Sequence, residues 1–147
     1  ESLVGPEGPQ GPKGDTGDPG PKGDPGEDGA DGAPGPGTWV YSVAGILEPL
    51  VGNIPIYNDT GRELTIVAVR ASVGQAPTGS GVTVDVNLNG NTSILSTPLT
   101  IPANQTTARA TVFTTATLAD GDYLTVDIDS VGSTNPGEGL VVQVTVM

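Results

Sequence analysis

Glycine recurs at every third position from Gly5 to Gly35, which gives eleven consecutive Gly-X-Y triplets, and proline fills many of the X and Y positions. In a collagen triple helix, three polyproline II chains wind so closely that only glycine fits at the axis, once per three residues of each chain. The period therefore predicts a collagen-like triple helix over residues 5–37, and with it a homotrimer. A flexible Gly/Pro-rich linker is the alternative, but it would need no unbroken period.

Two copies of the sequence Lys-Gly-Asp lie within this period, one containing Lys13 and Asp15 and the other Lys22 and Asp24. In a staggered triple helix, the lysine and aspartate of such a sequence approach each other from neighbouring chains. We therefore expect interchain ion pairs here, although exposed pairs add little stability and weaken with salt. An ordinary solvated charged surface is the alternative.

The chain of 147 residues has 17 acidic and 5 basic side chains, a net charge of -12, and neither cysteine nor histidine. This composition excludes disulfides and thiolate metal sites, and it argues against binding to nucleic acid or to an anionic membrane. No apolar run is long enough to span a membrane, so we expect no membrane insertion. Residues 1–4 do not resemble a signal peptide, and we interpret them as the end of an upstream segment of a longer chain.

The glycine period breaks at Thr38, where the next axial glycine would fall, and the single tryptophan of the chain, Trp39, follows directly. Three copies of Trp39 could bury a large aromatic area on a threefold axis at this junction. The alternative is an ordinary core tryptophan within one subunit.

Residues 38–147 change to a period of two, with β-branched residues and frequent turn signals, and contain no convincing helical stretch. The dipeptide Asn89-Gly90 is typical of a two-residue hairpin turn. About eight strands in this length predict an all-β domain, an antiparallel β-sandwich of jelly-roll or immunoglobulin-like kind, which would act as a trimeric head. The expected strands are 39–44, 52–57, 63–73, 82–88, 92–97, 106–115, 123–128 and 140–146.

Carboxylates are the only candidates for catalysis or metal binding, because histidine and cysteine are absent and both lysines lie in the glycine period. Asp127 and Asp129 share one strand face, while Asp120 and Asp122 lie at a turn. A glycosidase pair or a calcium site must be considered. We favour a solvated strand face and an aspartate-stabilised turn, and expect no enzyme activity, metal or cofactor.

Four residues of the expected loops are of the types that bind carbohydrate: Tyr57, Asn58, Arg62 and Asn135. They are candidates for contact with a glycan or receptor. Nothing in the sequence brings them to one place.

A short collagen-like segment followed by a small, cysteine-free β-domain resembles the fibre and tail appendage proteins of tailed bacteriophages, particularly those of actinobacterial hosts. The likeness is carried by the Gly-X-Y run and by residues 53–61, 84–90 and 121–129. It implies a trimer on the virion surface, attached through upstream residues to other virion proteins. Its distal domain would meet a glycan or protein receptor on the host surface.

Two other functions share this plan. A bacterial cell-surface or spore-surface collagen-like adhesin would need a secretion signal and a wall anchor upstream. A trimerisation cap would bind no ligand at all.

Overall fold

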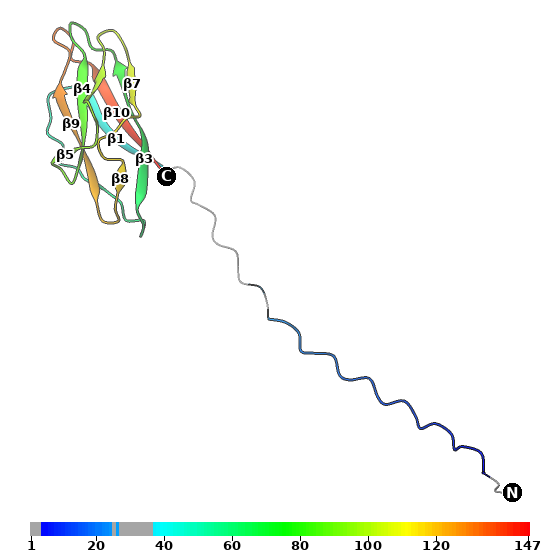
Figure 1. Cartoon of the computed structure of the whole chain (residues 1–147). Coiled ribbons are helices and arrows are strands. Elements are labelled where there is room, and N and C mark those ends of the chain that lie inside the picture. The colour runs from blue at the N-terminus through cyan, green and yellow to red at the C-terminus, as the bar shows by residue number, and fades with distance from the viewer. Residues whose placement is uncertain (1–3, 25, 27–36) are drawn as a thin grey trace. The chain divides into compact units, whose positions relative to one another are not determined.

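The structure, a computed structural model, describes residues 4–24, 26 and 37–147, and the chain divides into two units, Glu1–Gly32 and Ala33–Met147 (Figure 1). All the strands lie in the second unit, and the described residues contain no helix. Consistent with this, no described helix is long and apolar enough to cross a membrane.

The expected collagen triple helix is wrong. Residues 4–24 and 26 form an exposed chain without helix or strand, and a Cβ on any of their eight glycines would meet no heavy atom within 4 Å. No close-packed axis therefore surrounds these glycines. The physical reason is that a polyproline II chain has no internal hydrogen bonds, so a Gly-X-Y repeat gains no packing from its own chain. The rest of the expected segment, residues 27–36, lies outside the described residues, as do residues 1–3.

The interchain ion pairs expected within the glycine period stay a prediction, since the contacts described are those of one chain. Lys13, Asp15, Lys22 and Asp24 are all exposed.

The second unit, which we call the β-domain, is an antiparallel β-sandwich, as predicted. Sheet A has the strand order β1-β10-β3-β7, with β8 also paired to β3; sheet B has the order β2-β9-β4-β5, with β6 also paired to β4 (Figure 1). Its strands are β1 (Gly37–Ile46), β2 (Ile56–Tyr57), β3 (Leu64–Gln75), β4 (Val82–Leu88), β5 (Thr92–Ser93), β6 (Leu99–Ile101), β7 (Thr107–Ala110), β8 (Thr117–Leu118), β9 (Tyr123–Ser130) and β10 (Glu138–Val146).

The strand order identifies the sandwich as a jelly roll rather than an immunoglobulin-like fold. The strands β5 and β6 both pair with β4, and β7 and β8 both pair with β3. We therefore count β5 and β6 together as one edge strand of sheet B, and β7 and β8 together as one edge strand of sheet A. The eight positions that result form two four-stranded sheets in jelly-roll order. On one side of the sandwich β6 contacts β7, and β1 and β2 are the strands at the opposite edges of their sheets.

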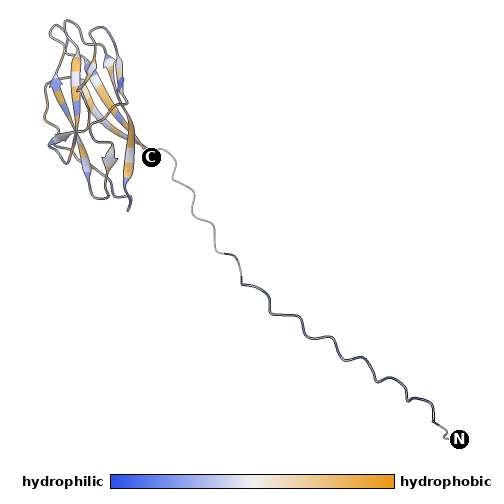
Figure 2. Ribbon diagram, viewed as in Figure 1, coloured by the Kyte–Doolittle hydropathy of each residue, from blue (hydrophilic) through white to orange (hydrophobic). Residues whose placement is uncertain are grey.

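The core is aliphatic and comes from alternate residues of the strands (Figure 2). Val82, Val84 and Val86 of β4 are fully buried, and the intervening Thr83 and Asp85 are only half-buried. The same alternation in β9 buries Leu124, Val126 and Ile128, and in β10 it buries Leu140, Val142, Val144 and Val146. The inward positions read from period two are thus confirmed for these residues, while Asn87 and Thr125 on the outward positions are also buried and Leu88 is only half-buried.

The turn at Asn89-Gly90 is also confirmed. Both residues have positive φ, 51° and 76°, and the strands pair again at Leu88 and Thr92, so the hairpin loop has three residues, 89–91, rather than two.

Several strand boundaries differ from the prediction. The strand β1 begins at Gly37, within the expected triple helix, because Gly37 pairs with Val146. The expected strand 52–57 shortens to Ile56–Tyr57, and 106–115 to Thr107–Ala110; the short strands β6 and β8 were not expected. In β3 a register shift near Val67 changes which residues face the core, from even-numbered positions before the shift to odd-numbered positions after it. This shift explains why apolar residues occupy both even and odd positions of the strand.

Candidate functional site

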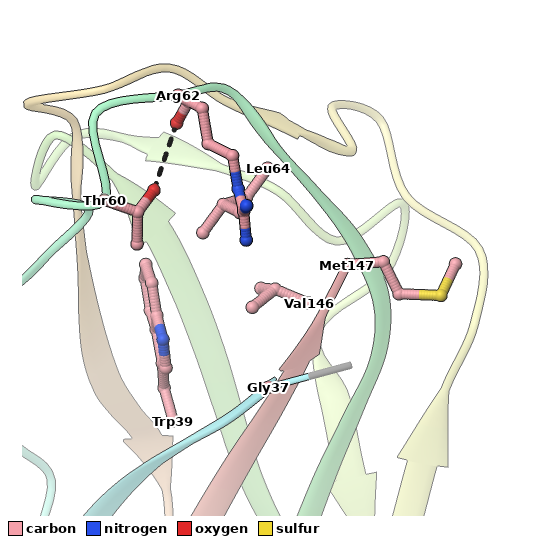
Figure 3. Close-up of a pocket in the computed structure, with 7 residues that line it drawn as sticks. All are labelled: Gly37, Trp39, Thr60, Arg62, Leu64, Val146 and Met147. Carbon is pink, nitrogen blue, oxygen red and sulfur yellow. Dashed lines mark hydrogen bonds between the residues drawn. The ribbon is translucent and has the colours of Figure 1, made fainter. Parts of the chain in front are cut away.

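A shallow pocket of about 110 Å³ opens at the end of the β-domain where β1 begins and β10 ends (Figure 3). It combines an indole ring, a guanidinium group and a hydroxyl group with aliphatic side chains. Its lining residues are Gly37, Trp39, Thr60, Arg62, Leu64, Val146 and Met147. The pocket therefore joins two residues that the sequence analysis treated separately, Trp39 and Arg62.

Asn58 fixes the loop that carries Thr60 and Arg62. Its side chain is fully buried, and its amide nitrogen donates to the carbonyl groups of Arg62, Leu118 and Ala119 at 2.9, 3.0 and 3.0 Å. Its Oδ1 accepts from the hydroxyl group of Thr60 at 2.7 Å. Asn58 therefore holds the pocket in shape, and its own amide is not presented to a ligand.

The turn before β9 closes on the same loop. The amide of Gly61, which has a φ of 76°, donates to Asp120 Oδ1 at 2.7 Å. The backbone of Asn58 exchanges two further hydrogen bonds of 2.7 Å with Gly121 and Asp122. Arg62 therefore projects from a loop tied at several points to the body of the domain (Figure 3).

Trp39 is partly buried and packs against the core of its own subunit. It also forms one wall of the pocket. Its expected role on a threefold axis stays a prediction, since the contacts described are those of one chain.

Tyr57 lies on the same end of the domain as the pocket and pairs with Tyr123. Their ring centroids are 5.1 Å apart at an angle of 50°, and Tyr57 is half-exposed. The hydroxyl group of Tyr123 donates to the carbonyl of Asn89 at 3.0 Å, which fixes this ring. The pair offers a second aromatic surface of the kind that packs against sugar rings.

Asn135 does not join the other three carbohydrate-type residues. It follows β9, whose eight residues begin beside Tyr57 and span roughly 26 Å by strand rise. Its side chain accepts from the amide of Gly137 at 3.0 Å, and its backbone pairs with Thr78. Asn135 therefore belongs to the loops at the opposite end of the domain.

The aspartates at the turn act mainly on the backbone. Asp122 accepts from the amide of Ala119 at 3.0 Å and from Asn89 Nδ2 at 2.9 Å. Asp120 likewise accepts a hydrogen bond from the amide of Gly61. Both aspartates therefore stabilise the turn, as we expected from the sequence.

The outer face of sheet B gathers three carboxylates. Asp127 pairs in register with Asp85, which the sequence analysis did not connect with it, and it accepts from Gly52 N at 2.6 Å and Asn87 Nδ2 at 2.9 Å. Burial raises the pKa of Asp129, and the charges of Asp85 and Asp127 add to this. Burial and then Asp127 likewise raise the pKa of Tyr41. Within the described ranges, no group of three or more acidic side chains is arranged to hold a metal ion.

The pocket suits one small polar group rather than a large ligand. Ligand pockets commonly measure about 300–1,000 Å³, so 110 Å³ accommodates a single side chain or part of one sugar ring. An indole ring beside a guanidinium group can pack against a sugar and donate hydrogen bonds to a hydroxyl or carboxylate group.

No protein-family model matches the chain, and no curated protein matches it. Among solved structures it is similar to a chain of the capsid of Ralstonia phage GP4, with a TM-score of 0.51 and 15% identity over 75% of this chain and 82% of that one. The likeness shows the fold alone. A β-(1,4)-mannanase of Podospora anserina, GH26-CBM35, gives a TM-score of 0.41 and 13% identity over 77% of this chain and 27% of that one, and we draw no argument from it.

Proposed function

We propose that this chain is a structural protein of a phage virion, in which an extended N-terminal segment carries a jelly-roll domain on the virion surface. The observation that carries the proposal is the jelly-roll strand order, together with the fold likeness to the phage capsid chain. Jelly rolls are common among viral capsid domains. The absence of histidine and cysteine favours a non-enzymatic role.

The β-domain is proposed to contact the host surface, and the pocket with Trp39 and Arg62 supports this role. The candidate ligand is a glycan or a protein side chain that places one polar group in the pocket. Adsorption to host cells should fall when Arg62 is replaced by Gln, whereas the stability of the domain should not.

The functional unit is proposed to be a trimer of identical chains. Support comes from exposed apolar side chains of the edge strands β1 and β2 and of the segment that joins them, which we call the edge surface and define as Val40, Ile46, Leu50, Val51, Ile54 and Tyr57. All six side chains are exposed, with Val51 at 79% and Ile46 at 65%. The edge strand β1 also contains no charged residue, and unprotected edges of this length usually pack against another chain.

Light scattering of the full chain tests the trimer. We expect three times the chain mass of 14.6 kDa, and a shift toward one chain mass when Val40 and Ile46 are both replaced by Lys. A monomer mass for the unsubstituted protein would contradict this part of the proposal.

The virion assignment is tested by fractionating a culture that produces the phage. Mass spectrometry should detect the chain in purified particles, and antibodies to the β-domain should label their surface in electron micrographs. Recovery in the bacterial envelope but not in particles would contradict it and favour a surface adhesin.

A further inference from the structure

The outer face of sheet A carries two arginines directly opposite each other. Arg70 of β3 pairs in register with Arg109 of β7, and both side chains are exposed. Directly opposed residues on antiparallel strands have Cβ atoms about 4.5–5.5 Å apart. Two of the three arginines of the β-domain therefore lie side by side on one face of the sheet.

The side chains around this pair are uncharged, and those of Gln143, Ser72 and Thr107 are polar. Gln143 of β10 is the next residue across the sheet from Arg70, and Ser72 and Thr107 form the neighbouring row. The guanidinium group of Arg70 donates to Thr107 Oγ1 at 3.3 Å. The guanidinium groups, which can donate hydrogen bonds to an anion, therefore lie beside amide and hydroxyl side chains, which can form hydrogen bonds with neutral ligands.

No carboxylate compensates the two arginines on their own sheet. The strands β1, β3 and β7 contain no acidic residue, and β10 contains only Glu138, at its first position. Like charges directly opposite each other destabilise a sheet, although the chain has 17 acidic residues in all. An anion bound between the two guanidinium groups would remove this repulsion.

We propose that the outer face of sheet A, through Arg70 and Arg109, binds an anionic polysaccharide by its carboxylate or sulfate groups. Each guanidinium group offers a planar pair of donors to such a group, while Gln143 and Ser72 bind hydroxyl groups of the same polymer. The open outer face of a sheet can be contacted by an extended polymer at several points along its length. The inference depends on the proposed function only for the source of the polymer, the host surface.

A second copy of the chain is the competing partner, because the outer face of sheet B is acidic. Its Asp85 and Asp127 already accept hydrogen bonds from Ser93, Gly52 and Asn87. Pairing of opposite faces would also stack copies into an open filament rather than a closed assembly. A polysaccharide is therefore the better partner for the arginine pair.

The test measures binding of the full chain to polygalacturonate, dextran sulfate and neutral dextran at about 0.1 M salt, where screening limits long-range repulsion. We expect binding to at least one anionic polymer and none to neutral dextran. The R70Q/R109Q variant should lose at least about tenfold in affinity. The matched control K13Q/K22Q, which removes the same charge from the N-terminal segment, should stay within about twofold. Substitution of both arginines by Lys keeps the charge but loses the planar donors and should give an intermediate affinity.

Three results would overturn the proposal. Equal losses in the two double variants would mean that only net charge matters. Absence of binding to both anionic polymers would exclude the ligand, and arginine-dependent self-association would identify a second copy as the partner. If the unfolding temperature of R70Q/R109Q is at or above that of the unsubstituted protein, misfolding is excluded as the cause of lost binding. If R70Q/R109Q unfolds at a lower temperature, the affinity of the variant with both arginines replaced by Lys is used instead to test the role of the arginines. The fractionation experiment is independent, so failure of the virion assignment would leave this result standing.

Discussion

The two units of the chain use glycine in opposite ways. In the N-terminal segment, glycine is strictly periodic, and a Cβ added at any described glycine would meet no heavy atom within 4 Å. In the β-domain, glycines follow no period, yet a Cβ at Gly52 would collide with the backbone of Val126, and one at Gly132 with that of Asn135. Regularity in a sequence therefore does not measure how many contacts a residue makes. We therefore expect substitutions to change the free energy of unfolding in the β-domain and to leave it unchanged in the N-terminal segment.

The largest effect is expected at Asn58. Replacement by Ala would remove three donated hydrogen bonds and leave buried carbonyl groups unpaired, at a cost of roughly 2–4 kcal/mol in the free energy of unfolding. Denaturant unfolding of the full chain measures it. The control is Asn91→Ala in the exposed hairpin turn, which should cost far less; equal losses would refute the structural role of Asn58.

The second largest loss of stability is expected where a glycine lies too close to its neighbours to accept a side chain. We expect Gly52→Ala to cost about 1–3 kcal/mol, because the new methyl group would displace the strand segment beside β9. Gly74→Ala is the matched control, since its Cβ would lie 3.6 Å from the nearest atom, and it should be neutral or stabilising by up to about 1 kcal/mol. Equal unfolding temperatures of the two variants would contradict the close packing of Gly52 against Val126.

A smaller effect is expected from charge crowding in the β-domain. Since the pKa of Asp129 is raised above 3.8, the folded state takes up this proton before the unfolded state as the pH falls. Asp129→Asn should therefore stabilise the domain modestly at pH 7, and the gain should disappear by the time the pH has fallen below the unfolded value. Asp15→Asn, in the N-terminal segment, should change the unfolding temperature at no pH. A gain for Asp129→Asn that grew toward acid pH would have the wrong sign.

No effect on stability is expected from Gly14→Ala. The added methyl group meets nothing in the structure. Calorimetry of the full chain should show the same transition as for the unsubstituted protein. Loss of a separate transition in this variant would contradict the description of the segment.

The sandwich could be predicted from sequence because its signals are local. Alternation in residues 82–88 and 123–128 marks the buried faces, and Asn89-Gly90 marks a turn whose φ values few other residues adopt. The short strands β6 and β8 escaped prediction because two or three residues are too few to show a period. The shift of face near Val67 depends on pairing with β10, which no local pattern reveals.

The site was less predictable than the fold, because it depends on which distant residues meet. Trp39 and Arg62 share a pocket because β1 and β3 both pair with β10, whereas Asn135, a candidate of the same kind as Arg62, lies at the other end. Asn58 has a residue type that suits sugar binding, yet its burial gives it a structural role. Arg70 and Arg109 both lie in expected strands, but their juxtaposition requires the register of β3 with β7.

The triple helix was predicted from the most regular feature of the sequence and is wrong for a simple reason. The glycine period specifies what each chain could contribute to a shared axis, and a shared axis is not a property of one chain. The β-domain differs because its period of two is satisfied within the chain, by pairing that buries both sheets.

Amide hydrogen exchange of the full chain tests the division between the two units most directly. We expect strong protection in β3, β4, β9 and β10, and exchange in residues 4–24 at the rate of an exposed peptide. Protected glycine amides at every third position of that segment would contradict the account.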